Sequence, residues 1–223
     1  MYGSKSIIIM RTENRTVCYH CYRPESSCMC EYITPIETKT RFIILMHTKE
    51  FKKTKNGTGH FTNLSLHNCE VYVGVDFSEH KTINQIIHDP ENSCYVLYPH
   101  EKSINLNDKK IGCEKKQTVV FLIDATWPCS KAMLTKSPNI DALQKISFTH
   151  EEVSGFTFKQ QPKEYCLSTM ESTLSLLRLL HSQQLEDLEA EKLDNFLLPF
   201  KKMVNYQLSC QNTTDSPRSE QLL

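Results

Sequence analysis

Four short apolar runs constrain the fold of this chain more strongly than any other feature. They occupy residues 41–46, 71–75, 94–98 and 118–123. Each run is too short for a buried helix, and continuous hydrophobicity is typical of strands that are covered on both faces. Helices are predicted over residues 60–67, 79–88 and 128–135, so strands alternate with helices. This alternation predicts an α/β domain with a largely parallel sheet.

Further elements follow from periodicity. Residues 168–184 are predicted to form the best helix, because Met170, Leu174 and Leu177 lie on one face at spacings of three and four. A second amphipathic stretch covers 186–198, where Pro199 marks a break or a restart, and a short strand is predicted over 146–150. Four segments are predicted to be irregular: a loose leader (1–16), a basic loop (48–60), a polar loop (100–116) and a disordered tail (211–223).

Ten cysteines are unusual for a chain without a predicted secretion signal, since the apolar run near the N-terminus covers only residues 7–10. No window approaches 18 consecutive apolar residues, so no membrane span is predicted. We therefore expect a cytoplasmic protein whose cysteines are reduced thiols or metal ligands. Six of them are scattered singly and are expected to be buried small side chains without a role. These are Cys69, Cys94, Cys113, Cys129, Cys166 and Cys210.

The other four cysteines, Cys18, Cys21, Cys28 and Cys30, fall within thirteen residues. Two short pairs of thiolates, seven positions apart, have the spacing of a tetrahedral zinc site. Such a site would stabilise a segment with little core of its own. A redox pair, a chance cluster, or replacement of one ligand by His20 are the alternatives.

The net charge is zero, from 26 basic and 26 acidic residues, which argues weakly against a protein that coats nucleic acid. This average hides a basic stretch, because residues 39–60 carry six Lys or Arg against Glu50, whereas residues 186–194 are acidic. The basic loop is not a Walker A motif, since no Gly-Lys-Ser/Thr follows it. It is either a solvated surface or a phosphate contact, where glycines would allow close backbone approach.

In parallel sheets, functional residues gather in the loops after the carboxyl ends of strands. Asp124 follows the most hydrophobic strand and is either a base, a group that orients a substrate, or a cap of the next helix. Trp127 beside it offers an aromatic face. Ser168 and Glu171 have the spacing of a capping box, and the helix N-terminus that they mark favours an anion.

Taken in order, these motifs resemble the DTW-domain family of tRNA-uridine aminocarboxypropyltransferases over about residues 17–205. The matching motifs are Cys18-x-x-Cys21-x-Arg23-Pro24, Cys28-x-Cys30, His47-x-x-Glu50, Thr58-Gly59, Leu97-Tyr98-Pro99, Asp124-x-Thr126-Trp127, Gln160-Gln161-Pro162 and the run from Leu167 to Glu171. The chain departs from the family pattern at Ala125, where members often carry Gly, and at His60, where they often carry Arg. It also has Met46-His47-Thr48 in place of Gln-His-Pro.

The resemblance implies a SPOUT-related, knotted catalytic domain over residues 36–210, preceded by the leader and zinc knuckle (1–35) and followed by the tail (211–223). It implies transfer of the 3-amino-3-carboxypropyl group from S-adenosylmethionine to N3 of a uridine in tRNA, with release of methylthioadenosine. A SPOUT-type RNA methyltransferase and a non-catalytic zinc-knuckle RNA-binding protein are the alternatives.

On positions that match the family motifs, or lie in the basic loop beside them, we expect three groups of site residues. Asp124 is the expected catalytic residue. The residues expected to bind the S-adenosylmethionine donor are Leu97, Tyr98, Pro99, Thr126, Trp127, Ser168, Thr169 and Glu171. Those expected to contact tRNA are His47, Glu50, Lys52, Lys53, Lys55 and Gly59.

Overall fold

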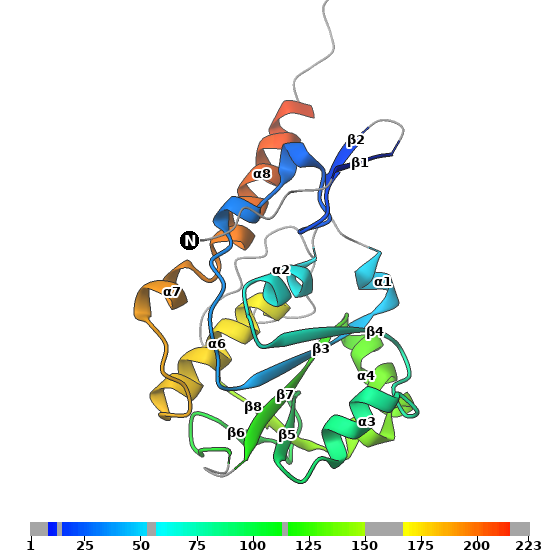
Figure 1. The fold of residues 1–223 in the computed structure, drawn as a ribbon, viewed down its shortest axis with the longest axis vertical. Coiled ribbons are helices and arrows are strands. Elements are labelled where there is room, and N and C mark those ends of the chain that lie inside the picture. The colour runs from blue at the N-terminus through cyan, green and yellow to red at the C-terminus, as the bar shows by residue number, and fades with distance from the viewer. Residues whose placement is uncertain (1–8, 13–14, 53–56, 113–115, 150–166, 215–223) are drawn as a thin grey trace, which may run out of the picture.

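The computed structural model describes residues 9–12, 15–52, 57–112, 116–149 and 167–214, and its centre is a six-stranded sheet (Figure 1). The strands run in the order β4-β3-β7-β5-β8-β6, and every neighbouring pair is parallel. Their bounds are β3 (Arg41–His47), β4 (Cys69–Gly74), β5 (Asn92–Leu97), β6 (Ile104–Asn105), β7 (Gln117–Asp124) and β8 (Gln144–Ser147). The predicted α/β fold with a largely parallel sheet is therefore confirmed.

The two most buried strands, β3 and β7, lie side by side in the interior of the sheet, where helices cover both faces. Alternate residues of β3 enter separate apolar clusters: Phe42 and Ile44 face one layer, and Ile43 and Leu45 face the other. One layer holds α3 (Lys81–His88), α4 (Trp127–Lys136) and α5 (Pro138–Asp141). The opposite layer holds α2 (Thr58–Leu64), α6 (Thr169–Ser182), α7 (Ala190–Asn195) and α8 (Leu198–Thr214).

Several segments that were predicted to be irregular are regular. The leader forms an antiparallel hairpin of β1 (Ile9–Thr12) and β2 (Arg15–Cys18). The basic loop contains α1 (Thr48–Phe51), which the His47 side chain caps by accepting a hydrogen bond from the Lys49 amide. The polar loop contains β6, which forms because it pairs with β8, and periodicity carries no sign of such pairing. These predictions of irregular structure were wrong where the elements form.

The boundaries of several predicted elements also change. The short strand β8 covers Gln144–Ser147, earlier than the predicted 146–150. Helix α8 begins at Leu198, so Pro199 restarts a helix, where its missing amide hydrogen costs nothing. The same helix continues to Thr214, past residue 211 where the tail was predicted to begin.

Among the described residues, no helix is both long and apolar enough to cross a membrane.

A buried carboxylate joins the start of β3 to the segment after α6. Glu186, which is 3% exposed, accepts hydrogen bonds from the backbone amides of Lys39 (2.9 Å) and Thr40 (2.6 Å). Bonds to a charged acceptor are stronger than neutral ones, and a buried amide that loses its partner is costly. Glu186 is therefore a structural anchor rather than part of the acidic surface that its neighbours suggest.

Replacing Glu186 with Ala should lower the free energy of unfolding by about 2–4 kcal/mol, because two backbone amides lose a charged acceptor. Urea unfolding of the purified protein measures this change. The exposed Glu101→Ala is the matched control and should stay within about 0.5 kcal/mol of wild type. Equal stability of the two variants would contradict the anchoring role.

Candidate functional site

The carboxyl edge of the central strands gathers the strongest candidate residues. Met46 of β3 and Asp124 of β7 are register partners, so the chain leaves the sheet at His47 and at Ala125 side by side. Asp124 is 7% exposed. A carboxylate this buried must be compensated by hydrogen bonds or charges. Its neighbours therefore decide what it can do.

The N-terminus of α6 supplies one of these neighbours. The Thr169 hydroxyl donates a 2.6 Å hydrogen bond to Oδ1 of Asp124, although 45 residues separate them in the chain. The predicted capping box is confirmed, because Ser168 Oγ accepts from the Glu171 amide (3.3 Å) and the Glu171 carboxylate accepts from the Ser168 amide (2.8 Å). The box fixes the first turn of α6 and hence the position of the Thr169 hydroxyl.

Gly59, in the first turn of α2, packs directly against the same carboxylate. A Cβ atom added at Gly59 would lie 2.3 Å from Oδ2 of Asp124 and 2.9 Å from Cε of Met46. A side chain at position 59 would therefore displace the carboxylate. The glycine of the Thr58-Gly59 motif makes room for Asp124, a role distinct from the backbone approach to phosphate that its sequence suggested.

The Thr126 side chain does not act as the cap that was one interpretation of this motif. Thr126 stands at the N-cap position of α4, but its side chain makes no capping bond. Beside it, Trp127 is 42% exposed, and its ring centroid lies 6.0 Å from that of Tyr98, just beyond β5. Pro99 is exposed next to them. The ends of β5 and β7 therefore carry an aromatic pair open to solvent.

The residues that were expected to contact tRNA are only partly described by the structure. His47 is buried, and its Nδ1 accepts a 3.0 Å hydrogen bond from the Lys49 amide. This nitrogen therefore already has a partner within the protein. Glu50 is half-buried and Lys52 is exposed. Lys53 and Lys55 lie outside the described residues, as does the Gln160-Gln161-Pro162 motif.

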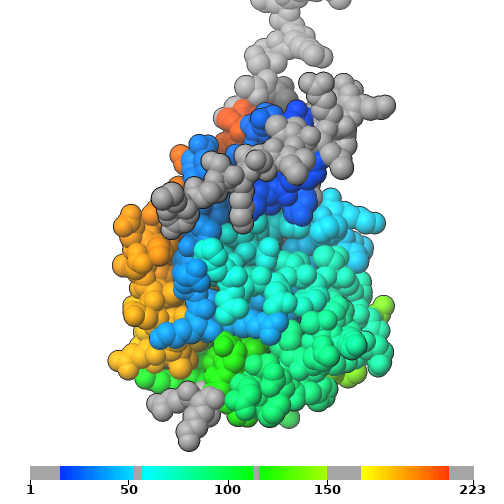
Figure 2. All heavy atoms as spheres, in the orientation of Figure 1, coloured from blue at the N-terminus to red at the C-terminus, as the bar shows by residue number. Residues whose placement is uncertain are grey.

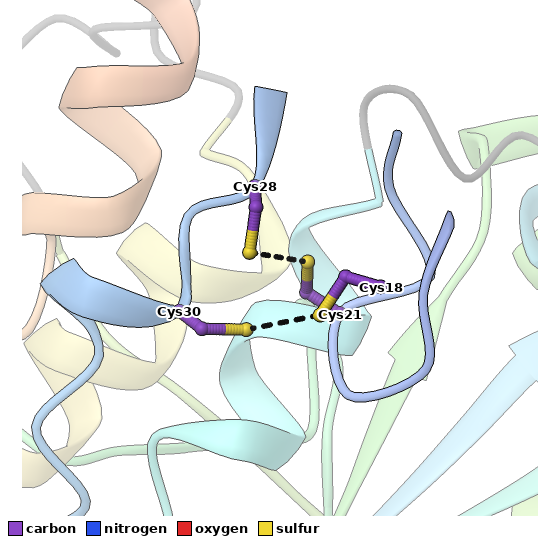
Figure 3. Close-up of side chains that lie close together, drawn as sticks. All are labelled: Cys18, Cys21, Cys28 and Cys30. Atoms are coloured by element: carbon purple, nitrogen blue, oxygen red, sulfur yellow. Dashed lines mark hydrogen bonds between the residues drawn. The ribbon is translucent and has the colours of Figure 1, made fainter. Parts of the chain in front are cut away.

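The four clustered cysteines face one another (Figure 3). Their Sγ atoms all lie within 4.8 Å, with 3.6 Å between Cys18 and Cys30 and 3.7 Å between Cys21 and Cys28. Tetrahedral zinc with Zn–S bonds of about 2.3 Å would separate its sulfurs by about 3.8 Å. A disulfide needs about 2.05 Å, so these sulfurs are unbonded. The residues fit a four-thiolate metal site, and His20 is not needed as a ligand.

The local electrostatics of the cluster differ between its members. Burial raises the pKa of Cys18, but hydrogen bonds from the backbone of Cys21 and His20 and from neighbouring thiols outweigh it and lower the pKa to about 7. Burial and neighbouring thiols raise the pKa of Cys30. One thiolate thus forms readily, whereas four together require a cation to offset their repulsion.

The scattered cysteines were expected to be buried, and this expectation was wrong for those that the structure describes. Cys69, Cys94 and Cys129 are half-buried, and Cys210 is exposed. Burial raises the pKa of Cys69 to about 12 and that of Cys94 to about 11, which keeps both thiols protonated and unreactive. Cys113 and Cys166 lie outside the described residues.

A buried arginine connects the segment of the cysteine cluster to the α/β domain. Arg23 is 3% exposed, and its Nε donates a 2.8 Å hydrogen bond to the Ser27 carbonyl. Its guanidinium also lies over the ring of Phe61 in α2, 5.9 Å from the centroid. Cys18 and Cys21 belong to the same apolar cluster as α2, α6 and α8. The cluster therefore shares its core with the elements that surround Asp124.

Sequence reasoning missed an aromatic contact between these parts. The imidazole of His60 lies with its ring centroid 5.6 Å from that of Tyr22 and 5.6 Å from that of Phe51. Burial lowers the pKa of His60. The position of His60 was noted only as a departure from the family pattern. Because the three rings come from separate elements, only their meeting in space reveals the group.

The Gly59→Ala variant should lose about 1–3 kcal/mol of unfolding free energy, because its methyl group overlaps the Asp124 carboxylate. Urea unfolding of the two single variants Gly59→Ala and Asp124→Ala, and of the double variant, measures the coupling. Removing the carboxylate should rescue part of the loss, so the double variant should be more stable than the sum predicts. Additivity within about 0.5 kcal/mol would exclude the proposed overlap.

Comparison with known proteins adds independent evidence. The family model described as the DTW domain matches residues 15–208. The chain is 28% identical over 201 residues to tRNA-uridine aminocarboxypropyltransferase 2 of Drosophila melanogaster, covering 87% of this chain and 76% of the relative. It is 23% identical over 209 residues to the Mus musculus protein of the same name, covering 92% and 68% respectively. The comparison with solved structures found no match. Because the family model spans most of its length, this chain belongs to the DTW domain family.

Proposed function

We propose that this protein transfers the 3-amino-3-carboxypropyl group from S-adenosylmethionine to N3 of a uridine in tRNA and releases methylthioadenosine. The observation that carries the proposal is the convergence of Gly59 and Thr169 on the buried carboxylate of Asp124. Membership of the DTW domain family and the printed names of its relatives support the reaction class.

In the proposed reaction, Asp124 accepts the proton of N3 as the uridine N3 attacks the donor. The N3 electron pair forms a bond to Cγ of the donor, the carbon–sulfur bond breaks, and its electron pair neutralises the sulfonium. General base catalysis of this kind requires a carboxylate held in place, which the Thr169 hydroxyl and the close fit of Gly59 support. The uridine must leave its stack in the tRNA, since N3 lies on the Watson–Crick edge of the nucleobase.

The site must also hide the methyl carbon of the sulfonium and aim Cγ at the nucleophile, which is catalysis by orientation. We assign the adenosine to the segment around Leu97, Tyr98 and Pro99 together with Thr126 and Trp127, where the ring pair offers a stacking face. Two carboxylates, Asp124 and Glu171, already meet the N-terminus of α6. We therefore propose that Ser168, Thr169 and Glu171 serve the donor side of the site through their hold on Asp124.

The remaining parts of the proposal concern recognition and context. We assign tRNA contacts to His47, Glu50, Lys52, Lys53, Lys55 and the segment of Gly59. We propose that the cysteine cluster holds a structural zinc ion in a knuckle (1–35), and that residues 36–210 are the catalytic domain. We also propose a SPOUT-related knot, which rests on membership of the DTW domain family. The eight cysteines that the structure describes are all free thiols, which favours a reducing, cytoplasmic setting.

Transfer is tested by incubating the purified protein with unmodified tRNA and S-adenosylmethionine labelled in the aminocarboxypropyl group. We expect label in the RNA, and nucleoside mass spectrometry should locate it on uridine. A full tRNA pool that takes up no label would overturn the proposal. Label entering RNA from a methyl-labelled donor would instead indicate a methyltransferase.

Replacing Asp124 with Asn should reduce the transfer rate by at least about 100-fold, because the amide cannot accept the N3 proton. Single-turnover kinetics with labelled donor measure this rate, and the exposed Asp187→Asn is the matched control. Donor affinity, measured by calorimetry, separates two roles: a base leaves affinity close to wild type, whereas a partner for the donor's ammonium group weakens it. Full activity in Asp124→Asn would refute the assignment.

The cysteine cluster should bind about one zinc ion per chain in reduced protein, because its sulfur geometry suits a tetrahedral site. Elemental analysis measures the metal content. A chelator should lower the melting temperature, and Cys30→Ser should lose the metal, whereas Cys94→Ser should retain it. Retention of metal by Cys30→Ser would contradict the four-thiolate assignment.

A further inference from the structure

Three aromatic rings meet at the boundary between the cysteine cluster and the α/β domain. Tyr22 follows Cys21 in the cluster, Phe51 ends α1, and His60 lies in α2. Figure 2 shows the N-terminal segment in blue above the cyan segment that contains α1 and α2. The imidazole of His60 contacts both neighbours, with centroid distances of 5.6 Å to each. We call Tyr22, Phe51 and His60 the aromatic trio.

Two rings of the trio are exposed to a degree that internal packing does not explain, whereas His60 is half-buried. Tyr22 is 51% exposed and Phe51 is 46% exposed, and they are the two most exposed large hydrophobic side chains in the described part of the chain. Rings that served only to attach the cluster to the domain would gain by being covered. Arg23 and Phe61 already perform that attachment in the buried core. The exposed faces are therefore available for a ligand.

The backbone at Tyr22 strengthens this reasoning. Tyr22 has a φ of 57°, and among the described residues only Gln184 is another non-glycine residue with a positive φ. This left-handed region disfavours a bulky side chain, and glycine would adopt it freely. The turn that contains Tyr22 is closed by a 2.8 Å hydrogen bond from the Cys18 amide to the Arg23 carbonyl, and a large, exposed ring at such a position is consistent with a ligand contact.

The surroundings identify the kind of ligand. Two exposed lysines lie close to Phe51 in the chain: Lys49 in α1, two residues before it with Glu50 between, and Lys52 directly after the helix. His60 directly follows Gly59, which packs on the Asp124 carboxylate. Aromatic rings beside positive charge are the combination with which proteins bind single-stranded nucleic acid, by stacking on bases and attracting phosphates. The residue that packs on the proposed catalytic carboxylate is therefore the immediate neighbour of His60 in α2.

We infer that the aromatic trio is a stacking surface for an unpaired nucleobase of the RNA substrate. This inference rests on the proposed function for its ligand, because the base would belong to the tRNA whose uridine is modified. A base held on these rings would bring the neighbouring nucleotides toward the carboxyl edge of β3 and β7. The cysteine cluster would thus supply one ring of the RNA site as well as stabilising its own segment.

The test measures binding of a short uridine-rich RNA oligonucleotide and of an unmodified tRNA transcript by fluorescence anisotropy, without donor. Tyr22→Gly removes the ring while suiting the positive φ, and Gln184→Gly is the matched control at the other such position. Phe51→Ala is paired with Leu208→Ala, an exposed apolar side chain on α8. Each ring variant should weaken binding by about 5- to 100-fold, and each control should match wild type.

Further measurements separate stacking from charge and from misfolding. Stacking carries no charge, so Tyr22→Gly and Phe51→Ala should leave the slope of log Kd against log salt unchanged, whereas Lys52→Ala should reduce it by about 0.7 for a single strand. Phe51→Tyr keeps a ring and should bind like wild type. If Tyr22→Gly loses metal or stability, Phe51→Ala alone decides the outcome.

The outcomes distinguish this inference from the transferase proposal. Two results would overturn the proposed stacking surface: unchanged RNA affinity in Phe51→Ala, or a changed salt slope in place of a loss of affinity. Neither result would affect the transferase proposal. Ring-dependent RNA binding by a protein that never labels tRNA supports the stacking surface and refutes the transferase. A wild-type protein that binds neither RNA overturns the stacking surface.

Discussion

The parallel pairing of β3 with β7 in the interior of the sheet is the constraint on which the candidate site depends. This pair is buried on both faces, so its register is held by the apolar clusters above and below it. The register sets Met46 beside Asp124, and the loops that follow both strands then start from the same edge. A slip of one residue would turn Asp124 to the opposite face. The packing of the core thus fixes the position of the proposed chemistry.

Burying a carboxylate at that edge carries a cost that neighbouring elements offset. Thr169 donates a hydrogen bond, the first turn of α6 places the positive end of a helix dipole nearby, and Gly59 leaves the space that the carboxylate occupies. Each compensation comes from a different part of the chain. This explains why the Thr-Gly, Asp-x-Thr-Trp and Ser-Thr-x-Glu motifs lie far apart in sequence but act on one group.

The cysteine cluster joins this arrangement by sharing the apolar core on the α2 and α6 side of the sheet. Arg23 lies between the thiols and Phe61, so the position of the cluster is tied to α2, and through Gly59 to Asp124. In the proposed enzyme, a metal-stabilised segment that grips RNA would thereby keep a constant position relative to the reacting group. Preorganisation of this kind reduces the entropy that must be lost on binding.

The sequence by itself determined the parallel α/β class, the capping box and the clustering of four thiols, because these follow from local periodicity and short spacing. It also singled out Asp124 by its place after the most hydrophobic strand. Tertiary structure alone decided that Thr169 contacts Asp124, that Gly59 makes room for it, and that Tyr22 meets His60. Such contacts join residues 38 to 65 positions apart, and they depend on strand order, which local patterns do not encode.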